Sequence, residues 1–203
     1  MNTAAKPDLR PRVASGAAAA RELPGDFAMW MFIFAELTVF ALLFAAYALA
    51  RASHAAEFAA AQAALNHAAG WGETVLLATS GWCVARARRA IAAARAASCS
   101  RWLFAALALG AGFALLRAAE FDADFARGVA LDASLFDMFY LALTFFHFMH
   151  VLMGLPILAV VAWRAHRGRY GAADHAGVET AGAYWHMVDL LWLVLFFLVY
   201  VSH

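Results

Sequence analysis

The sequence predicts an all-α, polytopic membrane protein built as a bundle of five transmembrane helices. Of its 203 residues, 66% are hydrophobic and only 14% are charged, and the mean hydropathy is +0.70. Five apolar segments approach the roughly 20 residues that a helix needs to cross a bilayer. The formal net charge of +1 provides no basic field of the kind that nucleic-acid binding requires. We therefore expect no nucleic-acid partner.

The elements follow one another with short connections. Residues 1–24 lack the continuous apolar core of a secretory signal, and we expect a disordered cytoplasmic tail there, followed by one transmembrane domain over 25–203. The expected spans are 27–50, 69–91, 103–121, 135–163 and 181–201. The second span is the weakest, because its apolar core stops at Ala85 and arginines follow. The third is short and closes with Arg117 and Glu120, one turn apart, which can pair.

Charge asymmetry orients these spans. Twelve of the 15 basic residues lie before the first span, in the stretch from the end of the second span to the start of the third, or between the fourth and fifth. The remaining three lie on the other side. Positive charge favours the cytoplasmic side of a membrane, so the N-terminus is predicted to be cytoplasmic and the C-terminus periplasmic.

Ionisable residues interrupt three of the apolar spans: Glu36 in the first, His147 and His150 in the fourth, and His186 with Asp189 in the fifth. Placing such a side chain at bilayer depth costs at least about 2.5 kcal/mol, so it normally faces protein or water. His147 and His150 share one face of their helix because they are three residues apart.

Each of these residues has a structural and a functional interpretation. Glu36 is either a hydrogen-bonded carboxyl that fixes helix packing, with His150 as the favoured partner, or a group for proton handling or lipid contact. A bis-histidine haem site needs two histidines at equal depth on facing helices, and His186 lies far shallower than His147 and His150. The structural interpretation is therefore favoured for the histidines. Trp185 fits an interfacial anchor or a packing residue.

Three segments together resemble the subunit III family of the haem-copper oxidases. PGDFAMWMFIFAELTVFALLFAAY (24–47) is similar to the glutamate-bearing helix of that family, TFFHFMHVLMG (144–154) to its two-histidine helix, and AYWHMVDLLWLVLFFLVY (183–200) to its last helix. Trp185, His186 and Asp189 match the closing signature of the family.

The length resembles bacterial five-helix forms that lack the first two of the family's seven helices. FAAAQAALNHAAGWGETVLLATSGW (58–82) is most similar to the NorE-type branch associated with nitric oxide reductase. Subunit III of a quinol or cytochrome c oxidase is the alternative. The resemblance implies a multi-pass protein of the bacterial inner membrane.

The resemblance also implies a non-catalytic accessory subunit, with no catalytic, cofactor or metal site of its own. Its expected partners are a larger haem-bearing catalytic subunit, which holds haem with copper or non-haem iron, and membrane lipids, including bound phospholipid. The candidate buried-polar or lipid-contact residues are Glu36, His147, His150, His186, Asp189, Glu120 and Trp185. Two other hypotheses remain: a haem-binding electron carrier that uses the histidines, and a proton-conducting protein built on Glu36.

Overall fold

A computed structural model describes residues 27–202, so the predicted tail and His203 lie outside the described part of the chain. Its elements are the helices α1 (Phe27–Ser53), α2 (Ala55–Ala63), α3 (His67–Ala92), α4 (Ala96–Ala126), α5 (Leu135–His166) and α6 (Ala176–Phe196), followed by the short π-helix η1 (Phe197–Val201). Each predicted span corresponds to one long helix. The sequence did not predict α2, and α4 is a 31-residue helix rather than a short one.

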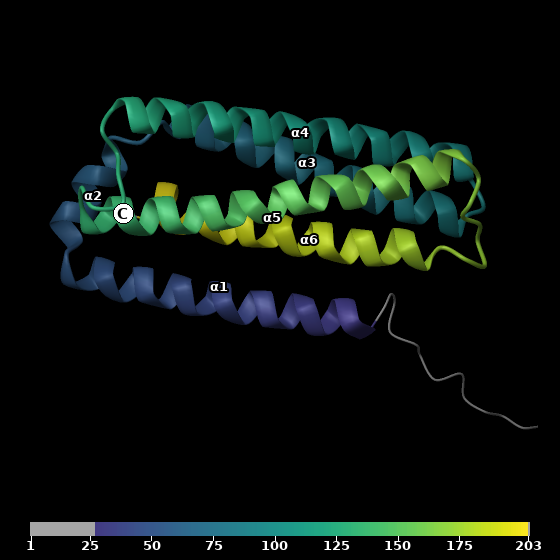
Figure 1. The fold of residues 1–203 in the computed structure, drawn as a ribbon, viewed down its shortest axis with the longest axis horizontal. Helices are drawn as coiled ribbons and strands as arrows, with labels where there is room; N and C mark the ends of the chain where they lie inside the picture. Colours follow the sequence, from purple (N-terminus) through teal and green to yellow (C-terminus); the bar gives the residue numbers. More distant parts are fainter. Residues whose placement is uncertain (1–26, 203) are drawn as a thin grey trace, which may run out of the picture.

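The five long helices run side by side, and α2 caps one end of the bundle (Figure 1). We call this the α2 end. The opposite end, where α3 and α5 finish, carries the arginines of segments 86–101 and 164–169, and we call it the basic end. The α3–α4 pair lies on the opposite side of α5 and α6 from α1 (Figure 1).

The outlying helix α1 touches the bundle along one narrow stripe. Its buried residues are Ile33, Phe40 and Tyr47, which are spaced seven apart and therefore share one face. Large apolar side chains on its other faces are exposed, including Met31, Phe34, Leu42 and Leu49. Most of the surface of α1 thus requires lipid or another subunit as its environment.

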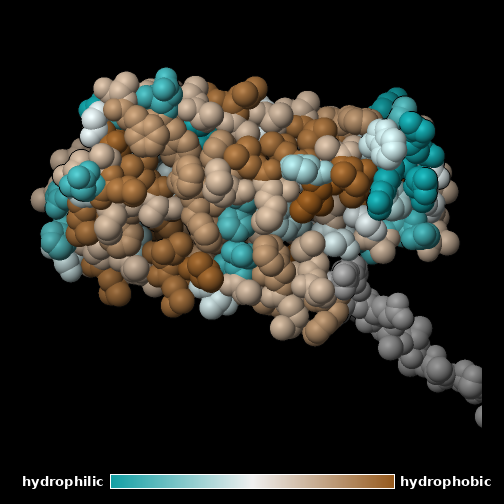
Figure 2. Space-filling model, viewed as in Figure 1, coloured by the Kyte–Doolittle hydropathy of each residue, from teal (hydrophilic) through white to brown (hydrophobic). Residues whose placement is uncertain are grey.

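The protein has the surface of a membrane protein. Apolar residues cover the middle of the visible face, apart from one small hydrophilic patch, and polar residues gather at the ends (Figure 2). Four helical segments are long and apolar enough to cross a bilayer: Phe27–Ser53, Ala96–Ala126, Leu135–His166 and Ala176–Val201. Helix α3 does not meet this test, because its composition is less apolar.

Helix ends follow local sequence signals. The Ser134 hydroxyl accepts a hydrogen bond from Asp137 N at 3.0 Å and caps the start of α5. Asn66 caps the start of α3 in the same way, through Ala69 N at 3.2 Å. Gly128 follows the end of α4 with φ +88°, a left-handed conformation that costs glycine least.

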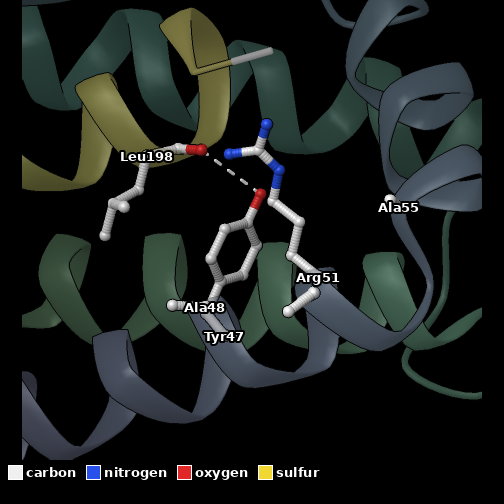
Figure 3. Close-up of a pocket in the computed structure, with 6 residues that line it drawn as sticks. Tyr47, Ala48, Arg51, Ala55 and Leu198 are labelled. Atoms are coloured by element: carbon white, nitrogen blue, oxygen red, sulfur yellow. Dashed lines mark hydrogen bonds between the residues drawn. The ribbon is translucent and has the colours of Figure 1, made fainter.

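Side chains from α1 and α2 contact the π-helix at the α2 end. Buried Gln62 of α2 donates to Leu198 O at 3.1 Å and to Val199 O at 2.9 Å. The Tyr47 hydroxyl of α1 also points toward Leu198 O, 3.3 Å away, and Arg51 lies beside it (Figure 3). These donors satisfy carbonyls of the last helical turn, which have no backbone donor because the helix ends at Val201. They also tie α1 and α2 to the end of the chain, where Arg51 donates to the Ser202 hydroxyl.

Candidate functional site

Glu36 and His150 form a polar pair inside the membrane-spanning region. Glu36 lies about 13 Å along α1 from its first residue, at 1.5 Å per residue. Its Oε2 atom is 3.0 Å from Nε2 of His150 on α5. The Glu36 side chain is 19% exposed and that of His150 only 7%. The predicted hydrogen bond between these residues is confirmed.

The other ring nitrogen of His150 limits the protonation states that this pair can adopt. His150 Nδ1 lies 2.8 Å from Phe146 O, and a carbonyl can only accept, so Nδ1 carries a proton. Nε2 then either accepts from a neutral Glu36 carboxyl or donates to a Glu36 carboxylate. In both arrangements the pair has no net charge, which suits its depth in the membrane.

We expect Glu36→Gln to keep the fold close to wild type and Glu36→Ala to lower the free energy of unfolding by roughly 1–3 kcal/mol. The glutamine amide can still donate to Nε2, whereas alanine leaves the buried ring nitrogen without a partner. Thermal unfolding in mild detergent measures both variants. An equal loss of stability in the two variants would show that the pair depends on a carboxylate charge rather than on a hydrogen bond.

His147 differs from its neighbour one turn away. Its ring is fully buried, and neither ring nitrogen has a hydrogen-bond partner among residues 27–202. It packs against the ring of Phe113 on α4 and that of Trp192 on α6, with centroids 5.9 and 5.3 Å away. The structure thus places His147 in the bundle core and His150 against α1.

The residues of the closing signature in α6 differ in how deeply they are buried. The His186 side chain is 37% exposed, and its Nδ1 lies 3.4 Å from Oδ2 of the more buried Asp189. Asp189 packs against Gly81 of α3, at a position where any Cβ would overlap its carboxylate. His186 therefore faces Asp189 rather than the histidines of α5. In the described part of the chain, no three His, Cys, Asp or Glu side chains are grouped so that they could hold a metal ion.

Trp185 lies in the core, with no exposed surface. Its indole nitrogen donates to the Ser80 hydroxyl at 3.0 Å, and that hydroxyl donates to Ala106 O at 2.7 Å. One tryptophan thus connects α6 to α3 and, through Ser80, to α4. Two turns later, Trp192 also connects α6 to α3, because its indole nitrogen donates to the Thr74 hydroxyl at 3.0 Å.

A second polar cluster, which we call the Arg117 network, was not predicted from the sequence. Fully buried Arg117 of α4 forms an ion pair with fully buried Glu73 of α3. Its guanidinium also donates to the Tyr140 hydroxyl of α5 at 3.2 Å and to the Tyr200 hydroxyl of η1 at 3.3 Å. Arg117 therefore binds groups from three other elements.

Acidic residues extend the Arg117 network toward the α2 end. The Tyr140 hydroxyl donates to Asp124 at 2.8 Å, and Asp124 also pairs with Arg127. The predicted pairing of Arg117 with Glu120 is wrong: Glu120 instead accepts from the Asn66 side chain at 3.0 Å, while the Arg117 guanidinium is directed at the buried Glu73 of α3. The network holds the helices together, and its members Asp124, Arg127 and Tyr140 also line a pocket of about 290 Å³ at the α2 end.

Sequence comparisons agree with this architecture. The family described as Cytochrome c oxidase subunit III matches residues 22–202. The chain is 32% identical to the cytochrome c oxidase subunit 3 of Synechocystis sp. over 176 residues, which cover 86% of this chain and 74% of the relative. It is 30% identical to that of Thermostichus vulcanus over 178 residues, 84% of each chain. The glutamate-bearing, two-histidine and closing helices all lie within the matched region. The chain belongs to the cytochrome c oxidase subunit III family.

Proposed function

We propose that this protein is a non-catalytic subunit III of a haem-copper terminal oxidase in a bacterial inner membrane. The observation that carries the proposal is the family match over nearly the whole chain, 22–202. The described residues fit a supporting role, because their polar groups are used to hold helices together. The subunit would stabilise its catalytic partner and shape lipid or gas access to it.

The oxidase assignment is preferred to the nitric oxide reductase-associated branch. The two relatives above carry the name cytochrome c oxidase subunit 3. Helix α1 offers a surface for a partner subunit, because its exposed apolar faces extend along the full length of the helix. In a bilayer the hydrophobic effect does not drive helices together, so a partner would bind this face by close packing.

Purification in mild detergent tests the proposal. We expect the chain to co-purify with a larger membrane subunit that contains haem and copper. A partner with haem and non-haem iron would instead support the nitric oxide reductase-associated branch. The accessory role would be wrong if the purified chain alone showed a stoichiometric haem absorption band, or if it never co-purified with a larger membrane protein.

Deletion of the gene provides a second test of the same role. We expect lower yield, stability or sustained turnover of the partner enzyme with its haem spectrum retained, since the haem ligands belong to the partner. Re-expression of the chain should restore these properties. Loss of the haem spectrum in the deletion strain would assign the chain a part in the redox centre.

The proposed topology has five crossings, with the N-terminus cytoplasmic. Helix α3 is the crossing that needs a test, because its composition is less apolar than that of the other four long helices. It lies alongside α4 in the bundle (Figure 1), and burial of its one acidic residue against Arg117 lowers the cost of placing it in the membrane. We expect a reporter fused after His203 to be active in the periplasm. Activity of the reporter in the cytoplasm would mean that α3 does not cross the membrane.

A further inference from the structure

A pocket at the basic end lies between the end of α3 and the start of α4. It has a volume of about 360 Å³ and is lined by Arg86, Ser98, Arg101, Trp102 and Ala105. Among residues 27–202, neither of its arginines lies within ion-pair distance of a carboxylate. The site therefore concentrates two positive charges that the described part of the chain does not neutralise.

Two tryptophans fix the position of one of these arginines. The Arg86 guanidinium lies 5.5 Å from the ring centroid of Trp82 and 5.4 Å from that of Trp102. The two rings meet edge to face, with centroids 5.2 Å apart. Cation–π contacts of this kind hold the guanidinium in one orientation and leave its edge free for an anion.

The depth of the pocket matches the headgroup boundary of a bilayer. Helix α4 has 31 residues and is therefore about 46 Å long, roughly 16 Å longer than a hydrocarbon core. If it is centred in the bilayer, about 8 Å at each end lies among headgroups. Arg86 is about 9 Å from the end of α3, and Arg101 is about 7.5 Å from the start of α4. Both arginines thus lie where phospholipid headgroups meet acyl chains.

The surface below the pocket is apolar, as an acyl chain requires. Trp71, Val75 and Trp82 lie on one outward face of α3, because their spacings of four and seven residues follow the helical period. They are 58%, 61% and 54% exposed. The site therefore combines two arginines at headgroup depth with an apolar stripe that leads toward the membrane centre.

We propose that Arg86 and Arg101 bind the phosphate of an anionic phospholipid in the inner leaflet, with its acyl chain along the Trp71–Trp82 face of α3. Basic pockets between helices on the cytoplasmic side have the chemistry that recognises such headgroups. A guanidinium can donate two parallel hydrogen bonds to a phosphate. This proposal uses only contacts within this chain and does not depend on which catalytic subunit is the partner.

Native mass spectrometry of the full-length chain in mild detergent tests the site. The probes are phosphatidylglycerol and phosphatidylcholine with identical acyl chains. We expect each single change, Arg86→Gln or Arg101→Gln, to weaken phosphatidylglycerol binding about fivefold, and the double change about 30-fold. Arg89→Gln is the matched control, because Arg89 is exposed at the same end but does not line the pocket. Its affinity should stay within about twofold of wild type.

Two further arms make each outcome decisive. The double variant Arg86→Lys, Arg101→Lys keeps both positive charges but cannot donate two parallel hydrogen bonds from one side chain, so it separates the effect of charge from that of hydrogen-bond geometry. Circular dichroism checks that every variant remains helical. Added inorganic phosphate should not displace the lipid, because only the lipid also uses the apolar stripe. The proposal fails if phosphate competes, if phosphatidylcholine binds equally well, or if the folded double glutamine variant binds phosphatidylglycerol like wild type.

Discussion

Arg117→Met is expected to lower the free energy of unfolding by about 3–5 kcal/mol, the usual cost of removing one partner from a buried ion pair. Arg117 is 1% exposed and its partner Glu73 is fully buried, so neither water nor lipid headgroups can replace the lost guanidinium. The hydroxyls of Tyr140 and Tyr200 would lose the same donor. Thermal unfolding in mild detergent measures the effect.

The same helix offers a matched control. Arg127 also pairs with an acidic residue of the Arg117 network, but its own side chain is 50% exposed. Arg127→Met should therefore cost less than Arg117→Met, because the exposed Arg127 guanidinium is already solvated by water and the Tyr140 hydroxyl still donates to the buried Asp124 carboxylate. Equal losses of stability from both substitutions would show that burial of the arginine does not determine the strength of these pairs.

Replacing both partners separates charge from packing. Glu73→Met in the Arg117→Met background removes the uncompensated carboxylate, so the double variant should be more stable than Arg117→Met alone. A double-mutant cycle gives the coupling energy between the two residues, which we expect to exceed about 1 kcal/mol. Additive losses would mean that Arg117 acts mainly through its tyrosine partners.

The long helices were predictable because hydrophobic length alone identifies a membrane span. Each predicted segment corresponds to one helix, and the Glu36–His150 hydrogen bond followed from two polar residues at bilayer depth. Helix α2 was missed because it is only nine residues long and too short to show an apolar period. The length of α4 was underestimated because polar residues of its last turns lie in the helix outside the hydrocarbon region.

The Arg117 network was missed for a different reason. Glu73 and Arg117 each lie four residues, or about 6 Å, from the same end of neighbouring predicted spans, so their equal depth was readable from the sequence. A local partner, Glu120, offered a simpler pairing. Sequence spacing cannot show which face of a helix a residue occupies relative to other helices. Only the packed structure shows that Arg117 faces α3 while Glu120 faces Asn66.

Gly110→Ala is expected to destabilise the bundle by roughly 1–3 kcal/mol, because Gly110 forms one wall of the slot that holds Trp185. A Cβ on Gly110 would come within 2.6 Å of Cζ2 and 2.8 Å of Cη2 of the indole. Gly154 forms another wall, where a Cβ would come within 2.8 Å of Cζ3. A rigid ring between two helices cannot move away as the tip of a flexible side chain can.

Gly112→Ala is the control, and its expected effect has the opposite sign. Gly112 lies on the same helix, and a Cβ there would come no closer than 3.7 Å to Leu76, an ordinary contact. Alanine is favoured over glycine inside a helix by up to about 1 kcal/mol. Gly112→Ala should therefore leave stability unchanged or raise it slightly. A similar loss at both positions would mean that the glycines matter for the helix itself rather than for Trp185.

The Trp185 indole fills this slot, so substitutions of Trp185 itself should also change the stability of the bundle. Trp185→Ala should cost about 3–5 kcal/mol, because it empties a fully buried site and leaves Ser80 without its indole donor. Trp185→Phe is smaller and has no ring atom where Cη2 lies. In that background Gly110→Ala should cost less than it does in the wild type, and the difference is the coupling energy between slot and ring. If Gly110→Ala costs the same in both backgrounds, the close approach of α4 to α6 does not depend on the fit of Trp185.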